Sequence, residues 1–102
     1  MTHDYKTVQY AEAQSIATIT LNRPDKRNAI SYELIDDLIA ALKQAASSSA
    51  QIVILTGAGK AFCSGMDLDN LKQLTGRTHE QNVDDSETMA SLFRTLYDFP
   101  KP

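Results

Sequence analysis

Residues 31–47, SYELIDDLIAALKQAAS, restrict the fold of this chain more than any other stretch. Drawn on a helix, the apolar side chains of this stretch share one stripe, which consists of Leu34, Ile35, Leu38, Ile39 and Leu42. Ser31 is placed to cap the helix, and acidic residues in the early turns complement the helix dipole. A helix with one apolar stripe must bury that stripe against another element, so its neighbours in the chain decide the fold class.

Segments with the pattern of β-strands flank this predicted helix. Residues 5–24, YKTVQYAEAQSIATITLNRP, are expected to form two strands, because threonines alternate in the second half with Ala17, Ile19 and Leu21. Residues 22–28, NRPDKRN, form a polar and basic turn after these strands. Residues 51–57, QIVILTG, are a short continuous apolar run, which predicts a strand covered on both faces.

The rest of the chain predicts two more helices. Residues 67–74, DLDNLKQL, have a short helical pattern, and residues 75–88 are polar and are expected to begin as a loop. A helical stripe resumes at Met89 and ends before the closing residues 98–102, DFPKP. The predicted order is therefore β-β-α-β-α-α, an α/β fold in one domain over residues 1–102, with a sheet of about three strands.

Composition argues against several classes of protein. The chain of 102 residues has 42% hydrophobic and 23% charged residues, which is ordinary for a globular domain. A net charge of −3 gives no reason to expect a nucleic-acid partner. The single cysteine cannot form an internal disulfide, and no apolar run approaches the length of a signal core or a membrane span. We therefore expect a cytoplasmic protein without a membrane or nucleic-acid partner.

The stretch GAGKAFCSGMDL, residues 57–68, invites a phosphate-loop interpretation that its spacing does not support. Ile54 and Ala61 stand where a P-loop needs glycine and Ser or Thr, and Phe62 stands where a dinucleotide fingerprint needs its third glycine. The glycines still permit tight turns, and a helix that begins near Asp67 would present unpaired N–H groups to an oxyanion. On these grounds alone, a structural turn between strand and helix is the simpler interpretation.

Nucleophile and metal chemistry are also poorly supported by the residues. Cys63 would need a partner that stabilises its thiolate, but His3 lies near the terminus and His79 lies in the polar loop. A small packed side chain is the better interpretation of this cysteine. The run that begins at Asp67 starts like a calcium loop, but Leu71 occupies a ligand position and no glycine follows it. We therefore expect no metal.

Two longer motifs together are more specific than any glycine pattern. They are IATITLNRPDKRNAIS at residues 16–31 and VILTGAGKAFCSGMDL at residues 53–68. At this spacing they resemble the N-terminal part of the crotonase superfamily, the enoyl-CoA hydratase/isomerase family, and the resemblance runs from about Tyr5 to Pro102. It implies the N-terminal part of a spiral of ββα units that binds acyl-CoA thioesters.

The resemblance also implies roles for the residues of the second motif. Met66, which follows Gly65, would supply a backbone N–H to an oxyanion hole that stabilises the enolate of the thioester. Asp67 would hold the turn through hydrogen bonds from its side chain to the backbone. Ala29 and Ser64 would lie along the path of the adenine and pantetheine groups.

Basic residues are the candidates for the phosphates of CoA. By resemblance these are Lys26, Arg27 and Lys60, although Lys26 and Arg27 alone look like an ordinary solvated turn. Leu68 ends the second motif and is counted with the substrate-binding residues. Some family members carry a basic residue shortly after this position, but Asp69 and its neighbour do not supply one here.

Other parts of a complete family member lie downstream of the PKP segment. They are the second oxyanion donor, the glutamates that act as general acid and base, and the helices that build a trimer or hexamer. We therefore expect the 102-residue chain to be truncated and inactive alone, with no cofactor apart from the CoA of the substrate. Hydratase, isomerase, decarboxylase, hydrolase and dehalogenase reactions stay open. The alternative is a non-catalytic chain that binds CoA esters or a partner protein, because so small a sheet leaves an exposed edge.

Overall fold

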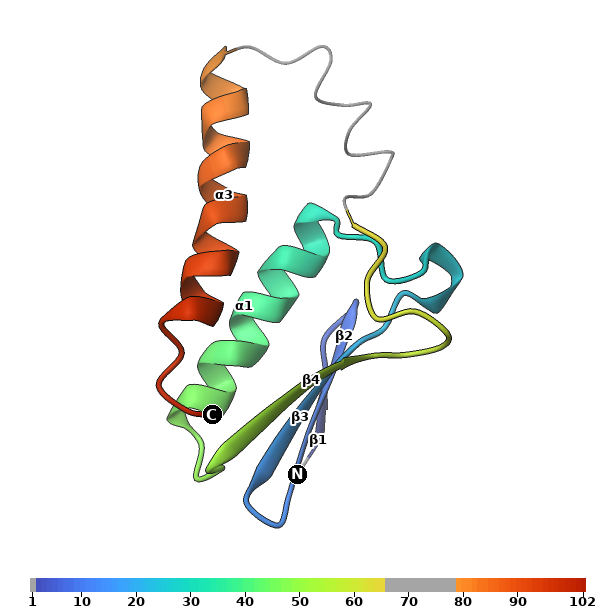
Figure 1. Ribbon diagram of the computed structural model, residues 1–102, viewed down its shortest axis with the longest axis vertical. Coiled ribbons are helices and arrows are strands. Elements are labelled where there is room, and N and C mark those ends of the chain that lie inside the picture. The colour runs from blue at the N-terminus through green and yellow to red at the C-terminus, as the bar shows by residue number, and fades with distance from the viewer. Residues whose placement is uncertain (1, 66–78) are drawn as a thin grey trace.

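The computed structural model describes the backbone of residues 2–65 and 79–102, and the side chains of residues 5–65 and 87–102. The helix predicted over residues 67–74 lies outside these ranges. The described elements are β1 (Thr2–Asp4), β2 (Val8–Ala13), β3 (Ile16–Leu21), the 3-10 helix η1 (Pro24–Lys26), α1 (Tyr32–Ser47), β4 (Ile52–Gly57) and α3 (His79–Tyr97). Figure 1 shows α1 between the sheet and α3, which confirms the predicted α/β class.

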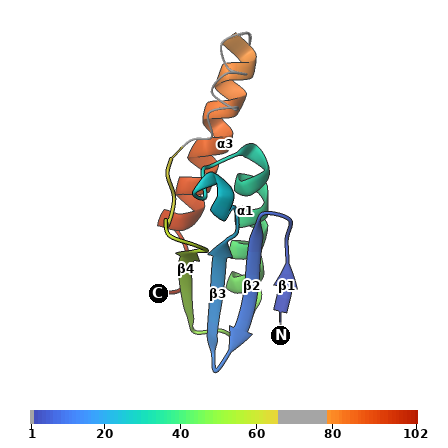
Figure 2. The same cartoon turned by 90° about the vertical axis from the view of Figure 1, so that its right-hand side faces the viewer.

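The four strands form one mixed sheet in the order β1-β2-β3-β4. The first three strands are antiparallel neighbours. β3 and β4 are parallel, because α1 returns the chain to the end of the sheet where β3 begins. The β3–β4 register runs from Ile16 opposite Ile52 to Leu21 opposite Gly57. In Figure 2 the strands lie side by side with α1 behind them. The ends of β3 and β4 therefore meet at the same edge of the sheet.

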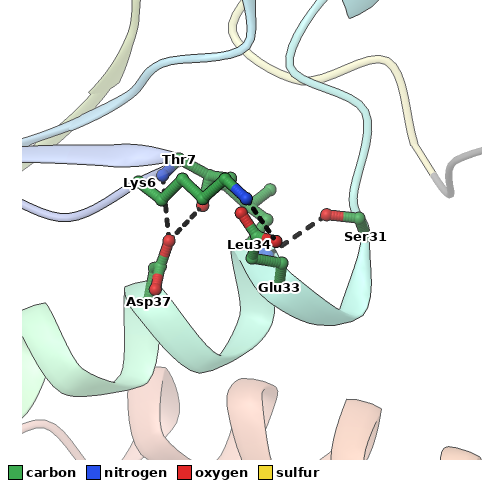
Figure 3. A network of polar contacts seen from close by, with 6 residues as sticks. All are labelled: Lys6, Thr7, Ser31, Glu33, Leu34 and Asp37. Atoms are coloured by element: carbon green, nitrogen blue, oxygen red, sulfur yellow. Dashed lines mark hydrogen bonds and ion pairs between the residues drawn. The ribbon is translucent and has the colours of Figure 1, made fainter.

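The apolar stripe predicted on α1 is confirmed as one half of the core. Its buried side chains are Leu34, Ile35, Leu38, Ala41, Leu42 and Ala45. They face the buried residues of β2 and β3, which are Val8, Tyr10, Ala17, Ile19 and Leu21. Ser31 caps the helix as predicted, because its hydroxyl oxygen accepts a hydrogen bond of 3.1 Å from the Leu34 N–H (Figure 3).

Strand β4 forms where it is predicted, but the prediction that both of its faces are covered is wrong. Val53 and Leu55 pack against the core, whereas Ile52 and Ile54 are 46% and 45% exposed. Both described helices lie on the other face of the sheet (Figure 2). In the part of the chain that the structure describes, this apolar side of β4 therefore faces solvent.

The helix predicted from Met89 begins earlier, at His79, so the prediction that His79 lies in a polar loop is wrong. Residues 75–78, where this loop is expected to begin, lie outside the described residues. The predicted stripe itself is confirmed, because Leu92 is buried and Met89 and Leu96 pack against the core. The polar first half of α3 has no apolar stripe, so hydrophobic periodicity cannot reveal it. Neither helix within the described ranges is both long and apolar enough to cross a membrane.

The N-terminus also differs from the prediction, because it forms a fourth strand. β1 pairs antiparallel with β2, and His3 lies opposite Tyr10. Three residues cannot show a reliable alternation, so this strand exists through its pairing with the edge of β2 and not through a local pattern. The sheet has four strands, not about three.

The C-terminal residues return to the sheet and to the end of α1. The Lys101 ammonium group donates hydrogen bonds of 2.8 Å to the carbonyl oxygens of Ala45 and Ser48. It thereby supplies the positive charge that the last turn of α1 lacks. The Val53 N–H of β4 donates to the Pro102 carbonyl oxygen at 2.9 Å, on the edge of β4 that β3 does not occupy.

Tyr10 is expected to make the stability of the fold sensitive to alkaline pH. Its side chain is buried in β2, and its hydroxyl donates a hydrogen bond to the Glu12 carboxylate. Burial first, and this hydrogen bond second, raise the pKa of Tyr10 to about 12, whereas an unfolded tyrosine titrates near its ordinary value of 10.0. The folded state therefore retains the proton longer, and the contribution to stability falls as pH rises from about 10 to about 12.

Urea unfolding of the wild type and of Tyr10→Phe, followed by circular dichroism across this pH range, measures the effect. Because phenylalanine cannot ionise, the wild type is expected to lose more stability than the variant between the two pH values. Parallel curves for the two proteins would contradict the prediction.

Candidate functional site

Two loops meet where β3 and β4 end. The first loop, residues 22–30, follows β3 and contains η1; the second loop, residues 58–65, follows β4. Parallel strands place both loops at the same edge of the sheet, and the Ala58 N–H donates to the Leu21 carbonyl oxygen at 2.8 Å. Figure 1 shows the two loops side by side beyond this edge. They carry the residues of the two sequence motifs.

Asn28 joins the two loops from the inside. Its side chain is fully buried, and its amide nitrogen donates hydrogen bonds to the carbonyl oxygens of Ala58 at 2.9 Å and Ala61 at 2.7 Å. Its amide oxygen accepts a bond of 2.8 Å from the Arg23 N–H. Two carbonyls on one side and an N–H on the other allow only one orientation of the carboxamide. One side chain therefore satisfies three backbone groups that lie in both loops.

The backbone around Asn28 is shaped for this contact. Arg27 and Asn28 both have positive φ values, of 53° and 56°, a conformation that asparagine tolerates better than most residues. Gly57 leaves the space that the carboxamide occupies: a Cβ atom there would lie 2.8 Å from the Asn28 amide nitrogen and 2.6 Å from the Phe62 carbonyl oxygen. Only glycine fits at position 57 without a shift of the loops.

Gly65 ends the described part of the second loop, and its backbone is held by the first loop. The Ile30 N–H donates a hydrogen bond of 2.6 Å to the Gly65 carbonyl oxygen. Gly65 has a φ of 102°, which residues with a side chain rarely adopt, and apart from its chain neighbours no atom of the described residues lies within 4 Å of the place where a Cβ would stand. Its glycine is therefore required by backbone conformation and not by crowding. The predicted residues Met66, Asp67 and Leu68 lie outside the described residues.

The structure brings the three predicted phosphate-binding residues to adjoining turns. Lys26 and Arg27 end η1, and Lys60 follows Gly59, whose missing Cβ would lie 3.1 Å from the Cβ of Pro24 in η1. All three cationic side chains are exposed. Within the described residues none of them has a carboxylate partner. Their charges are thus not neutralised by an ion pair within the described residues, although the exposed Asp25 also lies in η1.

The other predicted residues on the loops differ in exposure. Ala29 is half-buried, and its carbonyl oxygen accepts a hydrogen bond of 2.6 Å from the Arg23 guanidinium. Ser64 is exposed on the second loop. Cys63 is free and packs against the core, as expected for a small packed side chain. Among the described residues, no three His, Cys, Asp or Glu side chains are grouped to hold a metal ion.

Asn28 is the residue of this region to which the sequence assigns no role. An asparagine in a polar, basic turn looks solvated, because its partners are backbone carbonyls far along the chain. The sequence gives only an indirect signal for this role. Asn28 is a residue type that tolerates positive φ, it lies just before Ile30 and the capped helix, and Gly57 ends the next strand.

Known proteins match this arrangement in sequence and in structure. The sequence profile of the family described as Enoyl-CoA hydratase/isomerase matches residues 11–102. Enoyl-CoA delta isomerase 2 of Rattus norvegicus is 39% identical over 87 residues, which are 85% of this chain and 22% of the rat protein. Enoyl-CoA delta isomerase 3, peroxisomal, of Mus musculus is 34% identical over 97 residues, which are 95% of this chain and 31% of the mouse protein.

Solved structures agree with the sequence matches. The crystal structure of an enoyl-CoA hydratase from Shewanella pealeana aligns with a TM-score of 0.91 and 31% identity, over 94% of this chain and 37% of that one. An enoyl-CoA hydratase/isomerase from Xanthobacter autotrophicus aligns with a TM-score of 0.90 and 29% identity, over 97% and 37% of the two chains. This chain thus spans 22% to 37% of the length of these four proteins.

The family match over residues 11–102 includes both loops, β3, β4, α1 and α3, and this chain corresponds to the N-terminal portion of the relatives. The α/β arrangement of this chain is thus shared with longer proteins of known structure. The chain belongs to the enoyl-CoA hydratase/isomerase family, within the crotonase superfamily, and it represents the N-terminal part of that fold.

Proposed function

We propose that the protein that carries this sequence binds acyl-CoA thioesters where the two loops meet, and polarises the thioester carbonyl through an oxyanion hole. The names of the relatives, enoyl-CoA isomerase and enoyl-CoA hydratase, support this class of substrate. The observation that carries the proposal is the hydrogen bond from the Ile30 N–H to the Gly65 carbonyl oxygen. It restrains the second loop at the residue before the proposed oxyanion donor.

The backbone N–H of Met66 is the proposed donor. The Gly65 carbonyl belongs to the same planar peptide unit as this N–H. A hydrogen bond that restrains the carbonyl therefore restrains the whole unit. A fixed N–H is effective because it need not reorganise when negative charge develops on the thioester oxygen. Asp67 is proposed to hold the turn, and Leu68 is proposed to contact the substrate.

The exposed basic residues Lys26, Arg27 and Lys60 are proposed to bind the phosphates of CoA. Their turns adjoin each other, and within the described residues none of the three forms an ion pair with a carboxylate. The backbone of Ala29 and Ser64 lies on the same two loops and is proposed to follow the adenine and pantetheine groups. The substrate would thus run from the cationic turns toward Gly65.

Removal of two of these cations is expected to weaken binding of CoA esters selectively. An exposed ion pair contributes up to about 1 kcal/mol, so Lys26→Ala combined with Lys60→Ala should weaken binding about fivefold to thirtyfold. Isothermal titration calorimetry with crotonyl-CoA measures the loss. The thioester of pantetheine alone, which lacks the CoA phosphates, should bind both proteins equally.

Lys43→Ala is the matched control, because Lys43 is an exposed lysine of α1 outside the two loops. It should leave the affinity for crotonyl-CoA unchanged. Higher salt should weaken binding to the wild type more than binding to the double variant, because salt screens exposed charges. An equal loss for crotonyl-CoA and for the pantetheine thioester would contradict the assignment of these lysines to the phosphates.

A non-catalytic role as a partner-binding chain is the second candidate. The exposed face of β4, with Ile52 and Ile54, favours it because an apolar sheet face can pack against a partner protein. Absence of any binding to crotonyl-CoA by the wild type would favour this candidate over the thioester site.

A further inference from the structure

We propose that Asn28 is a positioning residue that holds the second loop in the geometry needed for thioester polarisation. The inference rests on the thioester site proposed above, and it assigns to the first loop a function other than phosphate binding. Asn28 does not contact the substrate in this scheme, because its side chain is fully buried behind the loops. It acts through the backbone of the second loop.

The contacts of Asn28 and Ile30 restrain the second loop at both of its ends. Near the start of the second loop, the Asn28 carboxamide holds the carbonyl oxygens of Ala58 and Ala61 at 2.9 and 2.7 Å. At the other end, Ile30, two residues after Asn28, holds the Gly65 carbonyl oxygen at 2.6 Å. The first loop therefore holds the backbone of the second loop in place through these hydrogen bonds.

The chemistry of the carboxamide is specific to this task. An aspartate at position 28 has nearly the same volume, but an oxygen would replace the amide nitrogen that faces the carbonyl oxygens of Ala58 and Ala61, and it has no hydrogen to donate to either. An alanine would leave both carbonyls and the Arg23 N–H without their partner in a buried place. Gly57 completes the fit, because any side chain there would meet the carboxamide.

Two measurements on the protein that carries this sequence test the inference. The first is amide hydrogen exchange. In Asn28→Asp, the Ile30 amide is expected to exchange at least about tenfold faster, because its bond to Gly65 depends on the restrained loops. The amide of Ile19, in the middle of the β2–β3 ladder, should keep its rate, which shows that the core stays folded. Unchanged exchange at Ile30 would overturn the inference.

The second measurement reports polarisation of the carbonyl directly. Cinnamoyl-CoA is a conjugated thioester, and its absorption band moves to longer wavelength when its carbonyl oxygen accepts hydrogen bonds. The wild type is expected to shift this band. Asn28→Asp should lose more than half of the shift and yet bind cinnamoyl-CoA within about threefold of the wild type, because the exposed phosphate-binding lysines are untouched. A full shift in the variant would overturn the positioning role.

Two further variants test whether the loss of the band shift comes from the Asn28 contacts and not from a general loss of folding. Gly57→Ala would place a Cβ atom 2.8 Å from the amide nitrogen of the same carboxamide and should reduce the band shift in the same way as Asn28→Asp. Asn22→Ala is the matched control in the first loop, since Asn22 contributes its backbone N–H to the Thr7 carbonyl oxygen and would keep it. It should preserve the full shift. Failure of the wild type to shift the band would overturn the proposed function and the inference with it, whereas failures confined to the variants bear on Asn28 alone.

Discussion

Replacement of Ile35 by alanine is expected to lower the free energy of unfolding by about 3 kcal/mol. Ile35 is fully buried in the stripe of α1 that packs against β2 and β3. Removal of three carbons there loses apolar burial and leaves a cavity that the sheet and the helix can close only in part. Urea unfolding at neutral pH, followed by circular dichroism, measures the difference.

Ile54→Ala is the matched control, because it removes the same atoms from an isoleucine that is 45% exposed. Its expected effect is below about 1 kcal/mol. A loss as large as that of Ile35→Ala would mean that the outer face of β4 is covered in the folded protein. The pair of variants thus measures how differently the two faces of the sheet are buried.

Replacement of Asp37 by alanine is expected to cost about 2–3 kcal/mol, because it removes the acceptor for a buried threonine. The Thr7 N–H and hydroxyl both donate to one carboxylate oxygen of Asp37, at 2.9 and 2.7 Å (Figure 3). Thr7 is 7% exposed, so water cannot readily replace the lost acceptor. These bonds tie the segment between β1 and β2 to α1. The same urea unfolding assay measures the loss.

Two variants separate this effect from a general loss of charge. Asp36→Ala removes a neighbouring exposed carboxylate of α1 and should change stability by less than about 0.5 kcal/mol. Asp37→Asn keeps one acceptor oxygen and should recover part of the loss. Equal effects of Asp36→Ala and Asp37→Ala would contradict the role given to the Thr7 contacts.

The other polar contacts between this segment and α1 differ in how much they contribute to stability. Lys6 and Glu33 approach to 3.7 Å, but their side chains are 82% and 47% exposed, so the pair adds little to stability. The Tyr5 hydroxyl donates to the Gln44 side chain at 2.6 Å. Burial, and then the charge of Asp37, raise the pKa of Tyr5 above its ordinary value. The Asp37 contacts therefore contribute more to the attachment of this segment than the Lys6–Glu33 ion pair does.

Elements with a local periodic signal are predictable from the sequence. The stripe of α1 and the alternation of β3 are confirmed, because a helix or strand buried on one face repeats its apolar residues with the period of the backbone. β1 and the first half of α3 carry no such signal, and both are missed. The strand β4 is found, but its apolar run cannot tell whether a second layer covers it.

The candidate site likewise has features that the sequence predicts and features that it does not. Its glycines, its basic turn and the similarity of its motifs to a family follow from the sequence, and Gly65 has the positive φ that its turn requires. The partners of Asn28 lie 30 and 33 residues further along the chain, at Ala58 and Ala61. No local pattern predicts a contact over that distance.

By itself, the sequence thus determined the α/β order, the apolar stripe of α1 and the family that the two motifs identify, since all of these are recorded in residue types and spacing. Only the tertiary structure decided that β3 and β4 bring their loops together, that Asn28 is buried between them, and that one face of β4 is left exposed. The physical reason is that burial of a polar side chain depends on which distant backbone groups the fold places around it.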